Sequence, residues 1–274
     1  MKNNSHHKII IFGQGILGSA FEKIFPAALI FPREKLDICD HKKVDEMLDN
    51  FKPQTLINCA AFTRVDDAEK EKEEAERVNG EAVKNLAQIC QEKKINLMHF
   101  STDYIFDGQN PDGYDENSVP CPINFYGESK LIGEENLKKY HDQFWLIRTS
   151  SVFGAGGKNF VDTMKNLSLS KKEVAVVNDQ FSSPTYATDL ACACQKIINN
   201  KVDFGTYHLT NSGSCSWSDF AREIFLNLKS NCQVREIPSS TLDRPAKRPR
   251  FSVLKNTKLD PLRSWRGTLE DYLD

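Results

Sequence analysis

A tyrosine and a lysine four residues apart form the pair in this sequence best suited to proton transfer. Tyr126 and Lys130 lie in the segment Tyr-Gly-Glu-Ser-Lys, and a helix would place both side chains on one face. A free phenol has a pKa of about 10, so it needs help to act at neutral pH. A neighbouring ammonium group favours the phenolate, and lowering the pKa by ~3 units requires roughly 4 kcal/mol. The pair predicts a catalytic tyrosine assisted by a lysine.

Thr102 adds a polar group at the end of a predicted strand. It follows the apolar run 95–100, and in open parallel sheets ligands bind beyond the carboxyl ends of the strands. Its hydroxyl can donate to a substrate oxygen or to the hydroxyl of Tyr126. Because serine and threonine are common at strand ends, the catalytic prediction rests on Thr102, Tyr126 and Lys130 together.

A glycine-rich turn follows the first apolar run and opens the first predicted helix. Gly13 permits the tight turn, Gly15 lets a diphosphate approach the backbone, and Gly18 lets the helix pack on the strand. The N–H groups at the start of the helix are then free to bind the anion. Gly13, Gly15, Ile16, Leu17 and Gly18 are therefore candidate contacts for a dinucleotide cofactor. The alternative is a plain strand–helix turn.

The residues after the second predicted strand bear on the choice of cofactor. NAD enzymes usually carry an acid there, which binds the ribose 2′-hydroxyl. Here the sequence is Ile-Phe-Pro-Arg, ending at Arg33, and no carboxylate precedes the arginine. Arg33 facing a 2′-phosphate favours NADP(H), and NAD(H) stays possible. The alternative for Arg33 is a solvated surface charge.

A cluster of basic residues near the C-terminus suggests a second anion site. Arg244, Lys247, Arg248 and Arg250 lie within seven residues, and guanidinium groups suit diphosphates. Arg248 is the candidate substrate contact. The alternative is a surface loop whose cations pair with acids elsewhere.

The elements that must position these residues alternate along the chain. Helical patterns cover 19–25, 44–51 and 68–94, and short apolar runs predict strands at 8–12, 28–31, 55–59, 95–100, 144–148, 174–177 and 205–209. This alternation predicts an α/β, Rossmann-type, doubly wound parallel sheet. The pattern loosens after residue 150. We expect a cofactor domain over 1–149 and a smaller substrate-binding lobe over 150–274, with segments returning to the first domain.

Composition excludes several classes of protein. The 274 residues carry a net charge of −2, which argues against nucleic-acid binding. No apolar run approaches the ~20 residues that span a bilayer, and residues 1–8 do not resemble a signal peptide. The eight cysteines form no metal-binding pair and are expected to be reduced thiols. These features predict a cytoplasmic protein without a membrane anchor.

Six stretches of the chain resemble a known family, in order along the sequence. They are Leu56–Glu69, Phe100–Phe106, Phe125–Glu134, Ile147–Gly154, Val177–Thr185 and Arg248–Leu254. The chain resembles the extended short-chain dehydrogenase/reductase superfamily and, within it, the dTDP-4-dehydrorhamnose reductase family. The resemblance implies reduction of the 4-keto group of a nucleotide-linked 6-deoxy-4-keto sugar.

The resemblance also assigns roles. Tyr126 would protonate the alkoxide at sugar C4, Lys130 would hold the nicotinamide ribose and lower the pKa of Tyr126, and Thr102 would orient the carbonyl. The other cofactor contacts it implies are Asp37 and Ile38 at the adenine half, Ala60, Ala61 and Thr63 at the middle, and Phe100. Asp103 and Tyr104 would face the substrate. Family members can bind Mg²⁺, but no ligand cluster for a metal stands out. A homodimer is a further expectation, which the sequence itself does not show.

Two departures from the family pattern affect these expectations. The three glycines are spaced two and three apart, where the family usually has three and three, so the diphosphate contacts shift. Ser151 stands where the family commonly has tryptophan, which leaves the identity of the sugar and the base open. Two other functions stay open. One is a nucleotide-sugar epimerase or dehydratase of the same superfamily, and the other is a non-catalytic regulatory subunit like that of methionine adenosyltransferase.

Overall fold

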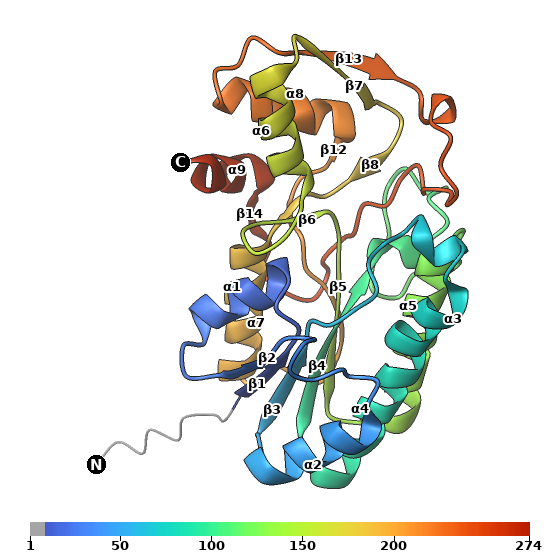
Figure 1. Cartoon of the computed structure of the whole chain (residues 1–274), viewed down its shortest axis with the longest axis vertical. Helices are drawn as coiled ribbons and strands as arrows, with labels where there is room; N and C mark the ends of the chain where they lie inside the picture. Colours follow the sequence, from blue (N-terminus) through green and yellow to red (C-terminus); the bar gives the residue numbers. More distant parts are fainter. Residues whose placement is uncertain (1–8) are drawn as a thin grey trace.

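A six-stranded parallel sheet forms the centre of the molecule (Figure 1). The computed structural model describes residues 9–274. The strand order is β10-β5-β4-β3-β1-β2, and every neighbouring pair is parallel. The strands are β1 (Ile9–Phe12), β2 (Leu29–Phe31), β3 (Thr55–Asn58), β4 (Asn96–Thr102), β5 (Phe144–Thr149) and β10 (Gly205–His208).

Helices cover both faces of this sheet. On one face, α1 (Ile16–Ile24) and α7 (Ala187–Asn199) share a core with Ile9 and Ile11 of β1. On the other, α2 (His41–Phe51), α4 (Ala82–Lys93) and α5 (Phe125–Tyr140) pack with Ile10 and Phe12. Successive side chains of β1 therefore enter opposite cores, which explains its unbroken apolar run. The predicted doubly wound α/β fold is confirmed.

The sheet changes its direction of growth at β1, because β2 lies on one side of it and β3 on the other. The loops that leave the carboxyl ends of β1 and β3 therefore diverge. Such a switch point opens a crevice in which ligands of doubly wound sheets bind. Gly13 follows β1 at this edge, and Thr102 ends β4.

The segment predicted as one helix over 68–94 is broken. It contains a short turn η1 (Asp67–Glu69), α3 (Lys72–Glu76), a π-helical turn η2 (Arg77–Glu81) and then α4. Asn79 in η2 is 1% exposed, and its amide donates to the Ser129 hydroxyl of α5 at 3.0 Å and accepts from the Phe62 N–H at 2.9 Å. The extra residue of a π-turn thus connects α5 to the loop after β3.

Helix α5 lies against its neighbours with almost no side chain between them. A Cβ added to Gly127 would come within 2.1 Å of the Tyr104 carbonyl oxygen, in the short turn η3 (Asp103–Ile105). A Cβ on Gly133 would lie 2.1 Å from the backbone carbonyl oxygen of Asn79. Behind these contacts, the buried Glu134 of α5 pairs with Arg148 of β5 at 2.7 Å. The helix carrying Tyr126 and Lys130 is therefore closely fixed.

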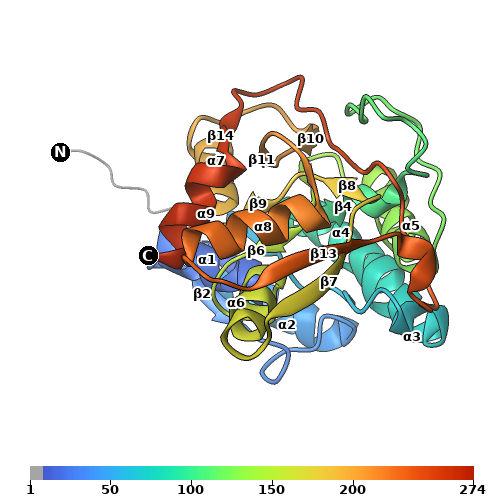
Figure 2. The ribbon, with the colours of Figure 1, turned by 90° about the horizontal axis from the view of Figure 1, so that it is seen from above.

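Elements after residue 150 build a smaller lobe and also return to the sheet. Its core joins Phe153, Phe220 and Trp265 beneath α6 (Phe160–Ser170), α8 (Trp217–Asn227) and α9 (Trp265–Leu273). The strand predicted at 174–177 lies here. β7 (Glu173–Val177) runs beside β13 (Gln233–Ile237), with which it pairs (Figure 2), and this pair is separate from the central sheet (Figure 1). Helix α7 and β10 rejoin the central layers. A domain boundary near residue 150 stays a prediction.

Short strand pairs complete the structure. They are β6 (Val152–Phe153) with β9 (Thr185–Tyr186), β8 (Phe181–Ser182) with β12 (Cys215–Ser216), and β11 (Asn211–Ser212) with β14 (Leu262–Ser264); η4 (Ser239–Thr241) follows β13. In residues 9–274 no helix is both long and apolar enough to cross a bilayer. The eight cysteines are unpaired thiols.

The close contact at Gly133 makes a stability prediction. Gly133→Ala should lower the free energy of unfolding by about 2 kcal/mol, because the methyl group must push α5 away from η2. Gly267→Ala in α9 is the matched control, since a Cβ there meets no atom within 4 Å. It should be neutral or stabilise by about 0.5–1 kcal/mol. Chemical denaturation of both variants measures the difference, and equal effects would contradict the packing described.

Candidate cofactor cleft and active site

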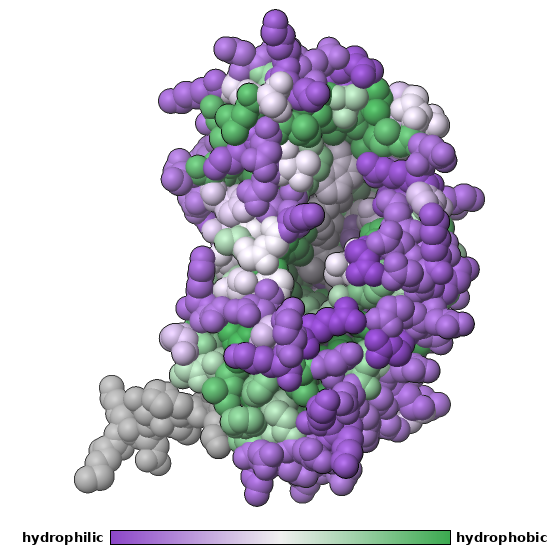
Figure 3. Space-filling view, in the orientation of Figure 1, coloured by the Kyte–Doolittle hydropathy of each residue, from purple (hydrophilic) through white to green (hydrophobic). Residues whose placement is uncertain are grey.

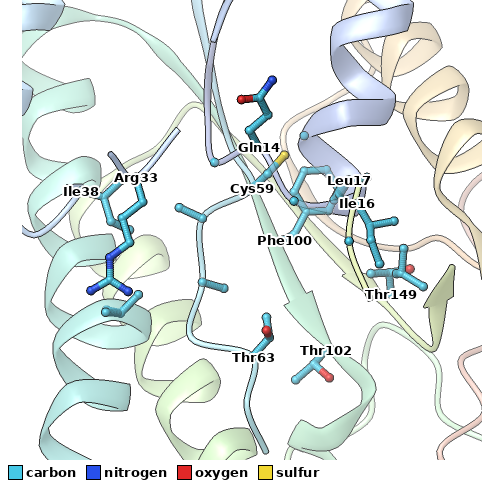
Figure 4. Close-up of a pocket in the computed structure, with 18 of the residues that line it drawn as sticks. Gln14, Ile16, Leu17, Arg33, Ile38, Cys59, Thr63, Phe100, Thr102 and Thr149 are labelled. Atoms are coloured by element: carbon cyan, nitrogen blue, oxygen red, sulfur yellow. The ribbon is translucent and has the colours of Figure 1, made fainter. Parts of the chain in front are cut away.

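A cavity of about 960 Å³ runs along the carboxyl edge of the sheet. Figure 3 shows the hollow near the middle of this face, with hydrophilic residues on its right and below and near-neutral residues on its left. All fourteen residues predicted to contact the cofactor line it: Gly13, Gly15, Ile16, Leu17, Gly18, Arg33, Asp37, Ile38, Ala60, Ala61, Thr63, Phe100, Tyr126 and Lys130. In Figure 4, Arg33 and Ile38 lie at one end, and Thr102 and Thr149 lie toward the other.

The glycine turn has the geometry that a diphosphate needs. Gly13 has φ +87°, and a Cβ there would meet the Ala60 nitrogen at 2.8 Å. A Cβ on Gly18 would lie 2.0 Å from the Gly13 oxygen, so the start of α1 rests directly on the turn. Gly15 faces open space, and as the N-cap of α1 it supplies no side-chain acceptor to the first N–H groups. The turn and the helix end therefore fit an anionic dinucleotide.

A loop from the smaller lobe, to which no function was assigned from the sequence, reaches this turn. A Cβ on Gly156, which has φ +97°, would lie 2.3 Å from the Ser19 hydroxyl of α1. The loop thereby brings Gly157 and Lys158 into the cavity wall. In the sequence, the two glycines that directly precede Lys158 were the feature that could have indicated this loop. The other wall residues that were not predicted from the sequence are Gln14, Pro32, Glu34, Leu36, Cys59, Val78, Ser101, Thr149, Ser150 and Val152.

Charged side chains cluster at the Arg33 end of the cavity. Glu74 accepts from Arg77 at 2.7 Å and lies 3.4 Å from Arg33, whose side chain is 67% exposed. Burial alone would raise the pKa of Asp37, but the Cys39 N–H and the charge of Arg77 bring it below its usual value. Two guanidinium groups and two carboxylates thus meet where the cofactor's adenosine half was expected.

Thr102 and Tyr126 come together at the opposite end. Tyr126 lies in the first turn of α5, which Asn124 caps by accepting the Gly127 N–H at 2.8 Å. Burial raises the pKa of Tyr126 to about 12, although the adjoining Thr102 hydroxyl opposes this. The spacing of Tyr126 and Lys130 had predicted that the lysine lowers that pKa. In this structure burial and the nearby Asp103 charge raise it instead. Tyr126 is therefore a neutral phenol with a proton to give.

Lys130 lies about one turn further along α5 and is 2% exposed. Its Nζ donates to the Phe100 carbonyl at 2.6 Å, which leaves further donors on the same ammonium group. Burial lowers the pKa of Lys130 to about 8, and the Glu134 charge opposes the shift. The lysine therefore keeps its charge at neutral pH.

Only some of the residues predicted to contact the substrate line the cavity. Asp103 and Ser151 line the cavity, whereas Tyr104 and Arg248 lie outside its lining. Arg248 is 10% exposed and bound to Asp66, with 2.7 Å between Nη2 and Oδ2. This is the alternative arrangement, in which a loop arginine pairs with an acid elsewhere. The Tyr104 ring stands edge-on to Tyr126, with 6.0 Å between the ring centres.

Ser151 takes a backbone conformation that is unusual for a non-glycine residue, with φ +46°. Its hydroxyl lies 2.8 Å from the Ser182 hydroxyl. No group of three or more His, Cys, Asp or Glu side chains in residues 9–274 is arranged to hold a metal ion.

Comparisons with known proteins agree with this geometry. The family described as "RmlD substrate binding domain" matches residues 7–274. A dTDP-4-dehydrorhamnose reductase from Streptomyces griseus is 38% identical over 87% of this chain and 82% of its own length. A dTDP-4-keto-6-deoxy-D-glucose reductase from Streptomyces niveus is 36% identical over 86% and 84%.

A solved structure extends the likeness to three dimensions. The dTDP-4-dehydrorhamnose reductase from Bacillus anthracis, crystallised in complex with NADP, superimposes with a TM-score of 0.94 at 36% identity. The match covers 97% of this chain and 98% of that one. The chain belongs to the dTDP-4-dehydrorhamnose reductase family.

Proposed function

We propose that this protein is an NAD(P)H-dependent reductase, with NADPH preferred, that acts on the 4-keto group of a nucleotide-activated 6-deoxy-4-keto sugar. The carrying observation is the single cavity that joins the glycine turn to Thr102 and Tyr126. When bound, the reduced nicotinamide supplies the hydride. A dTDP-linked sugar is the substrate class suggested by the names of the relatives, which places the reaction in the synthesis of polysaccharide precursors.

The chain's own residues divide the work. The glycine turn and the N-terminus of α1 bind the cofactor's diphosphate, and the free donors of Lys130 hold its ribose. Tyr126 donates its phenolic proton to the oxygen at sugar C4 as charge develops there. Thr102 orients that oxygen. Ser151, in place of a large aromatic ring, leaves room beside the sugar.

One assay separates this proposal from the other functions. Protein is mixed with NADPH and dTDP-, GDP- or UDP-linked 4-keto sugars, and cofactor oxidation is followed at 340 nm. A reductase consumes one NADPH per sugar, whereas an epimerase or dehydratase recycles the hydride and consumes none. No turnover, together with co-purification with a methionine adenosyltransferase, would favour the regulatory subunit.

The cellular setting belongs to the same proposal. Eight unpaired thiols suit a reducing compartment, which supports a cytoplasmic enzyme. A homodimer stays a prediction, and so does the Mg²⁺ requirement that the family resemblance implies. Light scattering and the activity after EDTA treatment test them.

The role of Tyr126 gives a direct prediction. Tyr126→Phe keeps the ring but removes the proton, so kcat should fall at least 100-fold, the usual range for loss of a general acid. The Kd for NADPH should change little, as measured by fluorescence titration. Tyr140→Phe, at the other end of α5, is the matched control and should keep wild-type turnover. Retained turnover in Tyr126→Phe would rule out the assigned acid.

The charge cluster gives a prediction about cofactor choice. Arg33→Ala should raise the KM for NADPH about tenfold and leave that for NADH nearly unchanged, because only NADPH carries the 2′-phosphate. Glu74→Gln should lower the KM for NADPH, since it removes the anion that competes for Arg33 and Arg77. Arg235→Ala, an exposed arginine paired with Glu173, is the control. Equal changes for both cofactors would contradict this role.

A further inference from the structure

Asp103 is a buried acid directly beside the catalytic threonine. Its side chain lines the cavity, yet the residue is only 3% exposed. The Thr102 hydroxyl donates to its Oδ1 at 3.0 Å, and the Ser150 hydroxyl donates to its Oδ2 at 2.8 Å. The Ser252 hydroxyl is a third partner. With both oxygens occupied, the carboxyl has little left to offer a substrate directly.

The bond to Thr102 has a consequence for catalysis, because a hydroxyl has one hydrogen. The Tyr104 N–H already donates to Thr102 Oγ1 at 3.2 Å, and Tyr126 adjoins the same oxygen. While the Thr102 hydroxyl donates to Asp103, it can only accept a hydrogen bond from a ligand in the cavity. A sugar carbonyl is also an acceptor, so it cannot bind Thr102 in that state.

We propose that Asp103 is a positioning residue that sets the direction of the Thr102 hydroxyl. The ionised carboxylate accepts a hydrogen bond from the Thr102 hydroxyl. The protonated carboxyl instead donates a hydrogen bond to Thr102 Oγ1, so that the Thr102 hydroxyl is free to donate to the carbonyl oxygen at sugar C4. This inference rests on the proposed function. A neutral buried acid that donates a hydrogen bond in an active site is chemically sound.

The surroundings of Asp103 favour the neutral form more than is usual for an aspartate. Burial raises its pKa to about 6, although the three hydroxyl partners lower it. The ionisable groups beside it are the phenols of Tyr104 and Tyr126, which add no positive charge. Nearby cations bind elsewhere: Lys130 donates to the Phe100 carbonyl and Arg248 pairs with Asp66. Charge developing on the sugar oxygen would disfavour the anion further.

The test is a pH profile. We expect kcat/KM for the sugar at saturating NADPH to be about tenfold higher at pH 5 than at pH 7, with an apparent pKa near 6, because the protonated form is the active one. In Asp103→Asn, the amide N–H can donate to Thr102 at every pH. Its kcat/KM should therefore be the same from pH 5 to pH 7 and close to the value that the wild type reaches at pH 5. Asp103→Leu should be slow at every pH. Asp112→Asn, on an exposed loop, should reproduce the wild-type profile.

A second measurement needs no turnover. The infrared difference between wild type and Asp103→Asn should show the stretch of a protonated carboxyl, lost as the pH rises through about 6. A flat wild-type rate profile, or an Asp103→Asn profile like that of wild type, would overturn the proposal. If the wild type oxidises no NADPH with any 4-keto sugar, the proposed function fails, and the absence of the infrared transition separately overturns the ionisation of Asp103.

Discussion

The contact between helix α5 and the Tyr104 carbonyl is the constraint on which the site depends. Only glycine at position 127 lets the first turn of α5 approach that close. The turn carries Tyr126, and the segment it touches begins directly after Thr102, so the contact places the two hydroxyls side by side. Gly133 and the π-turn at 77–81 repeat the arrangement further along the helix. Positions of this kind hold a catalytic pair more precisely than a layer of flexible side chains.

The strand topology provides the space in which a long ligand can bind. Because β2 and β3 lie on opposite sides of β1, the crevice opens above Gly13 and continues along the sheet edge to Thr102. The order of the strands thus brings the residues predicted to contact the cofactor to one cavity with Thr102 and Asp103. The chain that follows β5 contributes Ser150, Ser151 and Lys158 to its wall.

Local patterns predicted much of this from the sequence, and the failures have a common origin. The glycine turn, the strand ends and the Tyr126–Lys130 spacing are short-range features, so their places in the cavity could be predicted. Properties set by distant partners could not. The pKa of Tyr126 depends on burial by the whole fold, and Arg248 is held by Asp66, 182 residues earlier in the chain. The π-turn within 68–94 arises from packing against α5, which the helical periodicity does not report.

Because the chain returns to the sheet after residue 150, the first part of the chain needs the later segments to complete its structure. Strand β10 covers the outer edge of β5, and α7 completes the core shared with α1. A fragment ending at residue 149 would keep the glycine turn but expose an open strand edge and half of an apolar layer. Such a surface invites edge-to-edge aggregation. The nucleotide-binding half is therefore a poor candidate for an autonomous module in fusion proteins or domain shuffling.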